Sequence, residues 1–90
     1  MSAKVVLARP LRRLADGAAF LDVEAATVAE ALERLCQAYP ALRERVFSKD
    51  GLRQALRIFL NRQDIRALGG ADAALRDGDE VSLVPLVAGA

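Results

Sequence analysis

The chain has 90 residues, of which 53% are hydrophobic, so its size and composition indicate one globular domain with a single modest core. Thirteen basic and twelve acidic residues nearly cancel, and aromatic residues make up only 4%, which argues against a nucleic-acid-binding protein. The chain has no histidine and one cysteine, which excludes Ser-His-Asp and Cys-His catalysis, histidine-bearing metal sites and thiolate metal clusters, so we expect neither an independent enzyme nor a metal site.

The first part of the chain predicts two strands joined by a turn. Residues 3–8 are short, apolar and β-branched, which is typical of a strand. Residues 19–24 alternate between apolar and acidic side chains from Leu21 onward, as a half-buried strand does. Between the two, Asp16 and Gly17 favour a hairpin-like reversal.

The connection between these two strands carries a small basic cluster. Its members are Arg9, Arg12 and Arg13. A solvated loop is the simpler interpretation, because exposed arginines are common on loops. A docking patch for an acidic partner is the alternative.

A helix is predicted after the second strand. Thr27 and Glu30 form a capping box, in which each side chain satisfies a backbone N–H at the start of the helix. An apolar stripe follows at helical spacing: Val28, Ala31, Leu32, Leu35, Cys36 and Tyr39. Pro40 ends the helix, and residues 41–46 form another short turn. Because Cys36 lies on the apolar stripe, we interpret it as an inert packing residue.

A third strand is predicted at residues 56–60, after a loop at residues 48–51. Its three aliphatic residues alternate and should face the helix, which leaves Arg57 and Phe59 on the opposite face. A large apolar residue on an outer sheet face marks a partner surface, or else a loop or the tail covers it. Both interpretations of Phe59 remain open. Residues 65–68 are expected to form a short edge strand.

The chain ends with a turn, a strand and a thin tail. Residues 77–79 (DGD) form a turn signal, and residues 80–84 have high β-propensity. Pro85 ends the ladder, and residues 86–90 are only small or aliphatic. Such a tail fits a narrow channel in another protein, where it presents its terminal carboxylate. The alternative is a frayed terminus.

The element order predicts an α+β fold. A mixed sheet of four to five strands carries one main helix across one face, which buries both apolar sets in two layers. The first two strands form a hairpin, and the helix is a right-handed crossover to a strand that runs parallel to a neighbour. We divide the chain into a folded domain at residues 1–85 and a flexible tail at residues 86–90.

The sequence also predicts a cytoplasmic protein with no membrane partner. No stretch approaches the ~18 uninterrupted apolar residues that span a membrane, and the N-terminus lacks the apolar stretch of a signal peptide. A single cysteine cannot form an internal disulfide, which agrees with a reducing compartment.

These features together resemble the β-grasp, ubiquitin-like sulfur carrier proteins, above all the MoaD group, the small subunit of molybdopterin synthase, and also the ThiS-like carriers. The resemblance covers essentially the whole chain. Three segments carry it: residues 27–32 (TVAEAL) at the helix start, residues 59–61 (FLN) at a strand end, and residues 77–81 (DGDEV) before Pro85 and the tail.

The resemblance implies a protein co-substrate and not an enzyme. An adenylating enzyme of the ubiquitin-activating type, MoeB- or ThiF-like, uses ATP to activate the terminal carboxylate. Sulfur then replaces the adenylate and gives a thiocarboxylate. A second enzyme, such as a MoaE-like large subunit of molybdopterin synthase, receives the sulfur. The carrier itself binds no cofactor.

The resemblance also implies roles for particular residues. The reactive terminus is Gly89 or Ala90. The slender residues that thread a partner's active site are Leu86, Val87 and Ala88. The residues expected to dock on the partner are Phe59, Arg57, Val84 and Pro85.

The terminal residue departs from the family pattern. The family ends in Gly-Gly, whereas this chain ends in Gly89-Ala90, which adds a methyl group beside the reactive carbon and restricts the backbone there. Three explanations stay open: a tolerant activating enzyme, trimming of Ala90, or a form that docks but is never activated.

The receiving pathway is also open. Molybdopterin synthesis is the leading interpretation, and sulfur transfer to cysteine, thiamine or tRNA is the alternative within the same chemistry. Two further alternatives are a ubiquitin-like docking module that carries no sulfur and a modifier that is conjugated to lysines.

Overall fold

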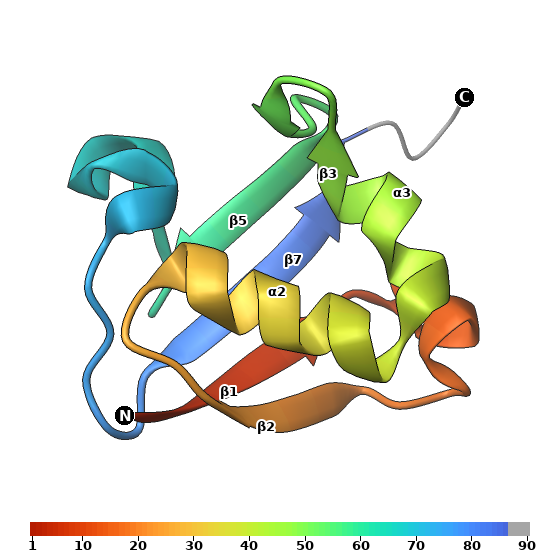
Figure 1. Cartoon of the computed structure of the whole chain (residues 1–90), viewed down its shortest axis with the longest axis horizontal. Coiled ribbons are helices and arrows are strands. Elements are labelled where there is room, and N and C mark those ends of the chain that lie inside the picture. Colours follow the sequence, from red (N-terminus) through yellow and green to blue (C-terminus); the bar gives the residue numbers. More distant parts are fainter. Residues whose placement is uncertain (87–90) are drawn as a thin grey trace.

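The computed structural model describes residues 1–86, which form one mixed sheet with a helix across one face (Figure 1). The strands of the sheet lie in the order β2-β1-β7-β5-β6. They are β1 (Ser2–Leu7), β2 (Phe20–Glu24), β5 (Leu56–Leu60), β6 (Gln63–Asp64) and β7 (Glu80–Pro85). The main helix is α2 (Val28–Ala38), and we call the sheet face away from it the outer face. The predicted α+β fold is confirmed.

Shorter elements connect these strands. The short helices are α1 (Arg9–Arg12) and α3 (Arg43–Val46), with single 3-10 turns at Arg13–Ala15, Pro40–Leu42, Ile65–Leu68 and Gly70–Asp72. A small hairpin consists of β3 (Phe47–Ser48) and β4 (Gly51–Leu52). In Figure 1, α1, α3 and this hairpin lie toward the end of the sheet where β1 and β7 finish.

The pairing of the strands places β7 at the centre of the sheet. β1 pairs antiparallel with β2, which confirms the predicted hairpin, and parallel with β7. β7 pairs antiparallel with β5 on its other side. The expectation that the strand after the helix runs parallel to a neighbour is therefore wrong, because β5 has only antiparallel neighbours. The parallel pair joins the first and last strands. β1 and β7 therefore finish at the same end of the sheet, which is the end where β5 begins.

The start of α2 has the predicted capping box. Thr27 Oγ1 accepts a hydrogen bond from the backbone N–H of Glu30 at 3.2 Å, and Glu30 Oε1 accepts one from the backbone N–H of Ala26 at 2.9 Å. The apolar stripe is buried from Val28 to Cys36, and Tyr39 is half-buried at the end of the helix. Within residues 1–86, no helix is long and apolar enough to cross a membrane.

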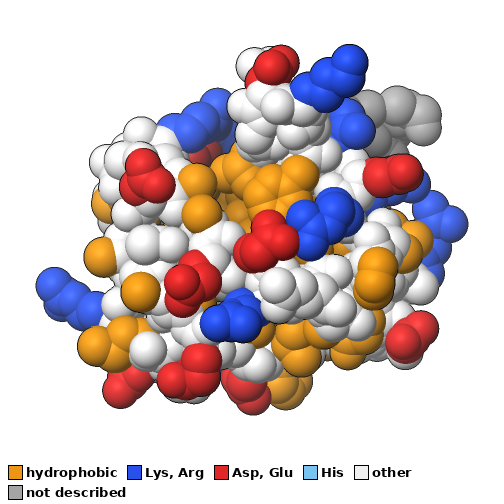
Figure 2. All heavy atoms as spheres, in the orientation of Figure 1, with side chains coloured by type: hydrophobic (Ala, Val, Ile, Leu, Met, Phe, Trp, Pro, Cys, Tyr) orange, Lys and Arg blue, Asp and Glu red, His pale blue; other side chains and the backbone are white. Residues whose placement is uncertain are grey.

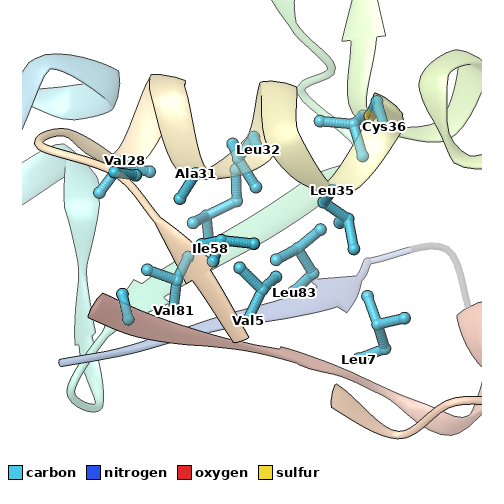
Figure 3. Close-up of a cluster of buried hydrophobic side chains, with 14 of the residues drawn as sticks. Val5, Leu7, Val28, Ala31, Leu32, Leu35, Cys36, Ile58, Val81 and Leu83 are labelled. Atoms are coloured by element: carbon cyan, nitrogen blue, oxygen red, sulfur yellow. The ribbon is translucent and has the colours of Figure 1, made fainter. Parts of the chain in front are cut away.

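The core lies between α2 and the inner face of the sheet (Figure 3). The helix contributes Leu32 and Leu35, which are fully buried and point toward the strands. The central strands contribute alternate residues, each fully buried: Val5 and Leu7 from β1, and Val81 and Leu83 from β7. Burying one such leucine stabilises the fold by about 1.5–3 kcal/mol, so this layer holds α2 on the sheet and fixes β7 between its neighbours.

Three connections differ from the prediction. The first connection contains α1 and a 3-10 turn, with Pro10 at the start of the helix, where a missing N–H costs nothing. Residues 65–68 form a 3-10 turn and not an edge strand, because Ile65 turns into the core and Asp64 caps the turn through the N–H of Arg66. The edge strand is the shorter β6. The loop at residues 48–51 is the tip of the β3–β4 hairpin.

Candidate functional site: the tail root and the outer sheet face

The root of the tail is held at the end of β7. One residue past that strand, the backbone N–H of Leu86 donates a hydrogen bond to the carbonyl oxygen of Ala55 at 2.7 Å. The Leu86 side chain is 48% exposed. The predicted tail residues Val87, Ala88, Gly89 and Ala90 lie outside the described residues. The structure therefore defines where the tail leaves the domain, at the edge shared by the ends of β1 and β7.

The other end of β7 is fixed by a small polar network. The two carboxylate oxygens of Asp79 accept hydrogen bonds from the backbone N–H of Arg76 at 2.8 Å and from the side-chain amide of Asn61 at 2.9 Å. The Arg76 bond is the larger cause, and together the two lower the pKa of Asp79 below its ordinary value. Asn61 Oδ1 accepts from the N–H of Glu80 at 2.9 Å. Residues 59–61 and 77–81, far apart in the sequence, thus meet and set the start of β7.

The structure brings together three of the four predicted docking residues. Arg57 on β5 lies opposite Val84 on β7, and Phe59 lies opposite Ser82 in the next pair along the same face. Val84 is 39% exposed, whereas Phe59 is half-buried. Because side chains alternate along a strand, Pro85 belongs to the opposite face from Val84. The predicted docking set is therefore divided between the two faces of the sheet.

The sequence analysis missed two apolar residues of the outer face, Phe20 and Val6. The strand register places them in one row across four strands: Phe20, Val6, Ser82 and Phe59. Phe20 is 49% exposed, and the ammonium of Lys4 lies 4.5 Å from the centre of its ring. The alternation of residues 19–24 already indicated that Phe20 lies on the outer face, because Phe20 shares a face with the acidic residues and not with Leu21.

Arg57 shares a carboxylate with Arg66 at the β6 edge of the sheet. Its Nη1 lies 3.4 Å from Asp64 Oδ2, and Arg66 Nη2 lies 2.9 Å from the same oxygen. Hydrogen bonds from the Arg66 side chain and backbone, with a smaller Coulombic contribution from Arg57, lower the pKa of Asp64 to about 2. Arg57 Nε is buried and has no hydrogen-bond partner among the described residues. Asp64 thus stays ionised and holds two guanidiniums beside Phe59, its cross-strand neighbour.

Comparison with known proteins assigns this arrangement to a family. A model described as the ThiS family matches residues 5–89, which include every strand of the sheet apart from the first residues of β1. The chain belongs to the ThiS family. The matched segment runs through the tail as far as Gly89 and leaves Ala90 outside it.

Three similar proteins support the ThiS-family assignment. Small archaeal modifier protein 1 of Haloferax volcanii is 45% identical over 71 residues, which cover 77% of each chain. Its crystal structure covers the whole of both chains with a TM-score of 0.86. Sulfur carrier protein CysO of Mycobacterium tuberculosis is 29% identical over 92 residues, which cover 99% of each chain. A chain in the crystal structure of the Amycolatopsis orientalis BexX/CysO complex has a TM-score of 0.89 and 26% identity, covering 98% of this chain and 99% of that chain.

These ThiS-family relatives confirm two predictions made from the sequence. The fold is the β-grasp, ubiquitin-like fold of the small archaeal modifier and CysO structures. The relatives are small carriers or modifiers and not enzymes, which confirms that the chain is not itself an enzyme.

The single thiol of this ThiS-family chain is not part of the site. Cys36 is 1% exposed and packs on the sheet side of α2 with the other members of the apolar stripe. Burial raises the pKa of its thiol, which keeps it in the unreactive protonated form. Cys36 is thus a packing residue.

Proposed function

We propose that this chain is a sulfur carrier whose C-terminal carboxylate is activated by an adenylating enzyme and converted to a thiocarboxylate. The observation that carries the proposal is the ThiS-family match, which extends from β1 through the tail to Gly89. The cofactor requirement falls on the activating enzyme, which uses ATP. The carrier supplies the carboxylate and a docking surface.

The chemistry needs a leaving group because a carboxylate is a poor electrophile. A carboxylate oxygen attacks the α-phosphorus of ATP and releases pyrophosphate, which leaves an acyl adenylate. Hydrosulfide, supplied by the sulfur donor, then attacks the acyl carbon and releases AMP, which leaves the thiocarboxylate. The second enzyme consumes the resulting thiocarboxylate as a sulfur donor.

The geometry of the tail root supports this role. Residues 86–90 carry no charged side chain and no ring, and five extended residues reach at most about 17 Å from Pro85. Leu86, Val87 and Ala88 would thread the partner's channel, and Gly89 or Ala90 would lie at its reactive centre. Just past the end of β7, the backbone N–H of Leu86 is bonded to the carbonyl oxygen of Ala55, so the domain presents the tail from a fixed point.

We assign docking to the outer face. Phe59, Val84 and Arg57 form one contact region there, and Phe20 extends it across the sheet. Exposed aromatic and arginine side chains suit a partner surface, since such residues dominate the binding energy of protein interfaces. Pro85 would contact the partner at the tail root. The partners are a MoeB- or ThiF-like adenylating enzyme and a sulfur-accepting enzyme.

For the receiving pathway, we propose molybdopterin synthesis with a MoaE-like large subunit as the first to test, in the cytoplasm. The β-grasp fold and tail are common to carriers that serve molybdopterin, cysteine, thiamine and tRNA thiolation. The choice therefore depends on which acceptor enzyme the outer face fits. Reconstitution with each candidate acceptor and the sulfurated carrier discriminates among them, because only the cognate acceptor turns over.

The deciding experiment is intact-mass measurement with mapping of the C-terminal peptide. The chain is incubated with the cognate adenylating enzyme, ATP and a sulfur donor. Replacement of one oxygen by sulfur at Ala90, or at a trimmed Gly89, is the expected result, and the mapped residue shows whether Ala90 is tolerated or removed. An Ala90→Gly variant is the matched control. If that variant gains sulfur while the natural sequence keeps an unchanged carboxylate, the natural form is inactive with that enzyme.

A second candidate function is conjugation to other proteins. The observation that favours it is the 45% identity to a protein named small archaeal modifier protein 1. Conjugation uses the same activated carboxylate but passes the acyl group to a lysine amine. It leaves isopeptide-linked products, in which the mass of the target protein is increased by the mass of the attached carrier. Sulfur transfer instead returns the carrier as a free chain.

A further inference from the structure

A groove of about 530 Å³ lies beside the root of the tail, away from the outer-face residues. Its floor is apolar and includes Leu11, Leu56 and Pro85. Its rim carries three arginines, Arg13, Arg45 and Arg53, all of them exposed.

The strand pairing explains why these residues meet. β1 and β7 are parallel, so α1 and the turn that carries Arg13 follow β1 at the edge where β7 ends. β5 is antiparallel to β7, so the segments that precede β5, with Arg45 and Arg53, reach the same edge. Figure 2 shows lysine and arginine side chains gathered toward the upper right, where Figure 1 places α3 and the β3–β4 hairpin.

The positive charge of this rim is not neutralised within residues 1–86. Arg53 Nε donates to the backbone carbonyl of Glu44, and no described carboxylate lies within ion-pair distance of Arg13, Arg45 or Arg53. Arg43, two residues before Arg45 in α3, does have such a partner, because it pairs with Glu33 at 2.6 Å. The groove has three guanidiniums against the single carboxylate of Glu44.

We infer that this groove is a second docking site, which receives a carboxylate-bearing segment of the adenylating enzyme at the mouth of the channel that takes the tail. The inference rests on the proposed function. Pro85 lines the groove and Leu86 leaves from it, so a protein that takes the tail must lie over the groove. An apolar side chain of that segment covers Leu11 and Leu56. Its aspartates or glutamates meet the arginine rim, where opposite charges steer the encounter.

The test measures binding of the full chain to its cognate adenylating enzyme without ATP, at low salt and at about 0.5 M salt, where charges are screened within a few ångströms. The variant is Arg13→Glu with Arg45→Glu. The control is Arg34→Glu, an exposed arginine of α2 outside the groove. We expect the double variant to bind about tenfold more weakly at low salt, a loss that shrinks at high salt. A double variant that binds as tightly as the wild type, or no worse than the control, overturns the inference.

Failure of the proposed function is separable from failure of this inference. If the wild type binds the enzyme and the charge reversal weakens that binding, the groove assignment holds even when no thiocarboxylate forms. If the wild type gains sulfur and the charge reversal changes neither the affinity nor the KM for the carrier, only the groove assignment fails. Thermal denaturation of each variant shows that the fold is retained.

Two other occupants of the groove are also outcomes of the test. NMR methyl signals of Leu11 and Leu56 are compared in the free chain with and without residues 87–90. A shift of these signals on truncation would assign the groove to the chain's own tail and overturn the inference. Binding of a single-stranded oligonucleotide that is lost in the double variant would assign it to nucleic acid, with the same consequence.

Discussion

The backbone N–H of Leu86 donates to the carbonyl oxygen of Ala55 at 2.7 Å, so the chain remains attached to the domain one residue beyond β7. This contact separates two functions along a short stretch of sequence. Residues before it belong to the folded sheet, and residues after it form the segment that we propose enters a partner. Changes on either side should therefore have different effects.

Removal of the last two residues tests the chemistry without touching the domain. Deleting Gly89 and Ala90 removes the proposed reactive terminus, while the described contacts of residues 1–86 do not involve it. We expect sulfur transfer to be abolished, with a melting temperature equal to that of the wild type. The measurement pairs intact-mass analysis after the activation reaction with thermal denaturation. Retained sulfur transfer in the shortened chain would exclude Gly89 and Ala90 as the reactive positions.

A charge introduced on the outer face should break docking. Phe20→Asp and Phe59→Asp each place a carboxylate in the proposed contact region. An aromatic anchor of an interface contributes about 2 kcal/mol or more, which corresponds to roughly a thirtyfold loss of affinity. Phe20 is the cleaner position, because it is 49% exposed and its replacement costs the fold less than that of half-buried Phe59.

The affinity of these variants for the adenylating enzyme is measured by titration calorimetry. Arg34→Asp, on the exposed side of α2, is the matched control and should bind like the wild type. If all three variants bind equally well, the outer face is not the docking surface.

The ion pairs of Asp64 predict a pH dependence of stability. The folded pKa of Asp64 is lowered to about 2, whereas an unfolded aspartate has a pKa of about 3.9. The folded state therefore binds a proton less readily than the unfolded state. Its stabilising contribution is complete above the unfolded value and is lost as the pH falls from about 4 toward about 2.

Urea denaturation at several pH values checks this dependence in the wild type and in Asp64→Asn. The two proteins should differ at neutral pH and converge near pH 2, where Asp64 of the wild type becomes protonated. Asp50→Asn, at the tip of the β3–β4 hairpin, is the control and has no described arginine partner. A difference between wild type and Asp64→Asn that persists unchanged at low pH would contradict the ion-pair explanation.

The packing of α2 predicts a large loss of stability from a single truncation. Leu32 is fully buried between the helix and the sheet, so Leu32→Ala leaves a cavity and should lower the free energy of unfolding by about 2–5 kcal/mol. Arg34→Ala, two residues away on the exposed side, should change it by less than about 0.5 kcal/mol. Chemical denaturation measures both. Equal losses would mean that α2 does not hold the core.

The pattern of apolar residues was sufficient to predict the layers. The alternation in residues 56–60 and the helical stripe from Val28 to Cys36 each have one period, and burial follows that period directly. The end of β7 was also predictable, because Pro85 is the last residue of a strand of high β-propensity.

Long-range pairing was harder to predict from one sequence. The neighbours of β5 depend on where β7 inserts, and no local pattern states that the last strand lies between β1 and β5. One sequence also does not show the register of the paired strands. For that reason it predicted neither the row from Phe20 to Phe59 nor the position of Pro85 on the opposite face. The arginines of the groove come from segments that meet only after all three strands are paired.

The central position of β7 has a consequence for quality control. β7 is bonded to β1 on one side and to β5 on the other, so its release requires both pairings to break. Amides of such a strand exchange with solvent only when the domain opens as a whole. An adenylating enzyme that docks as we propose, on the tail together with the surface around its root, would therefore select intact molecules. A damaged or partly folded copy would no longer offer both features in the same place, and the enzyme would spend no ATP on it.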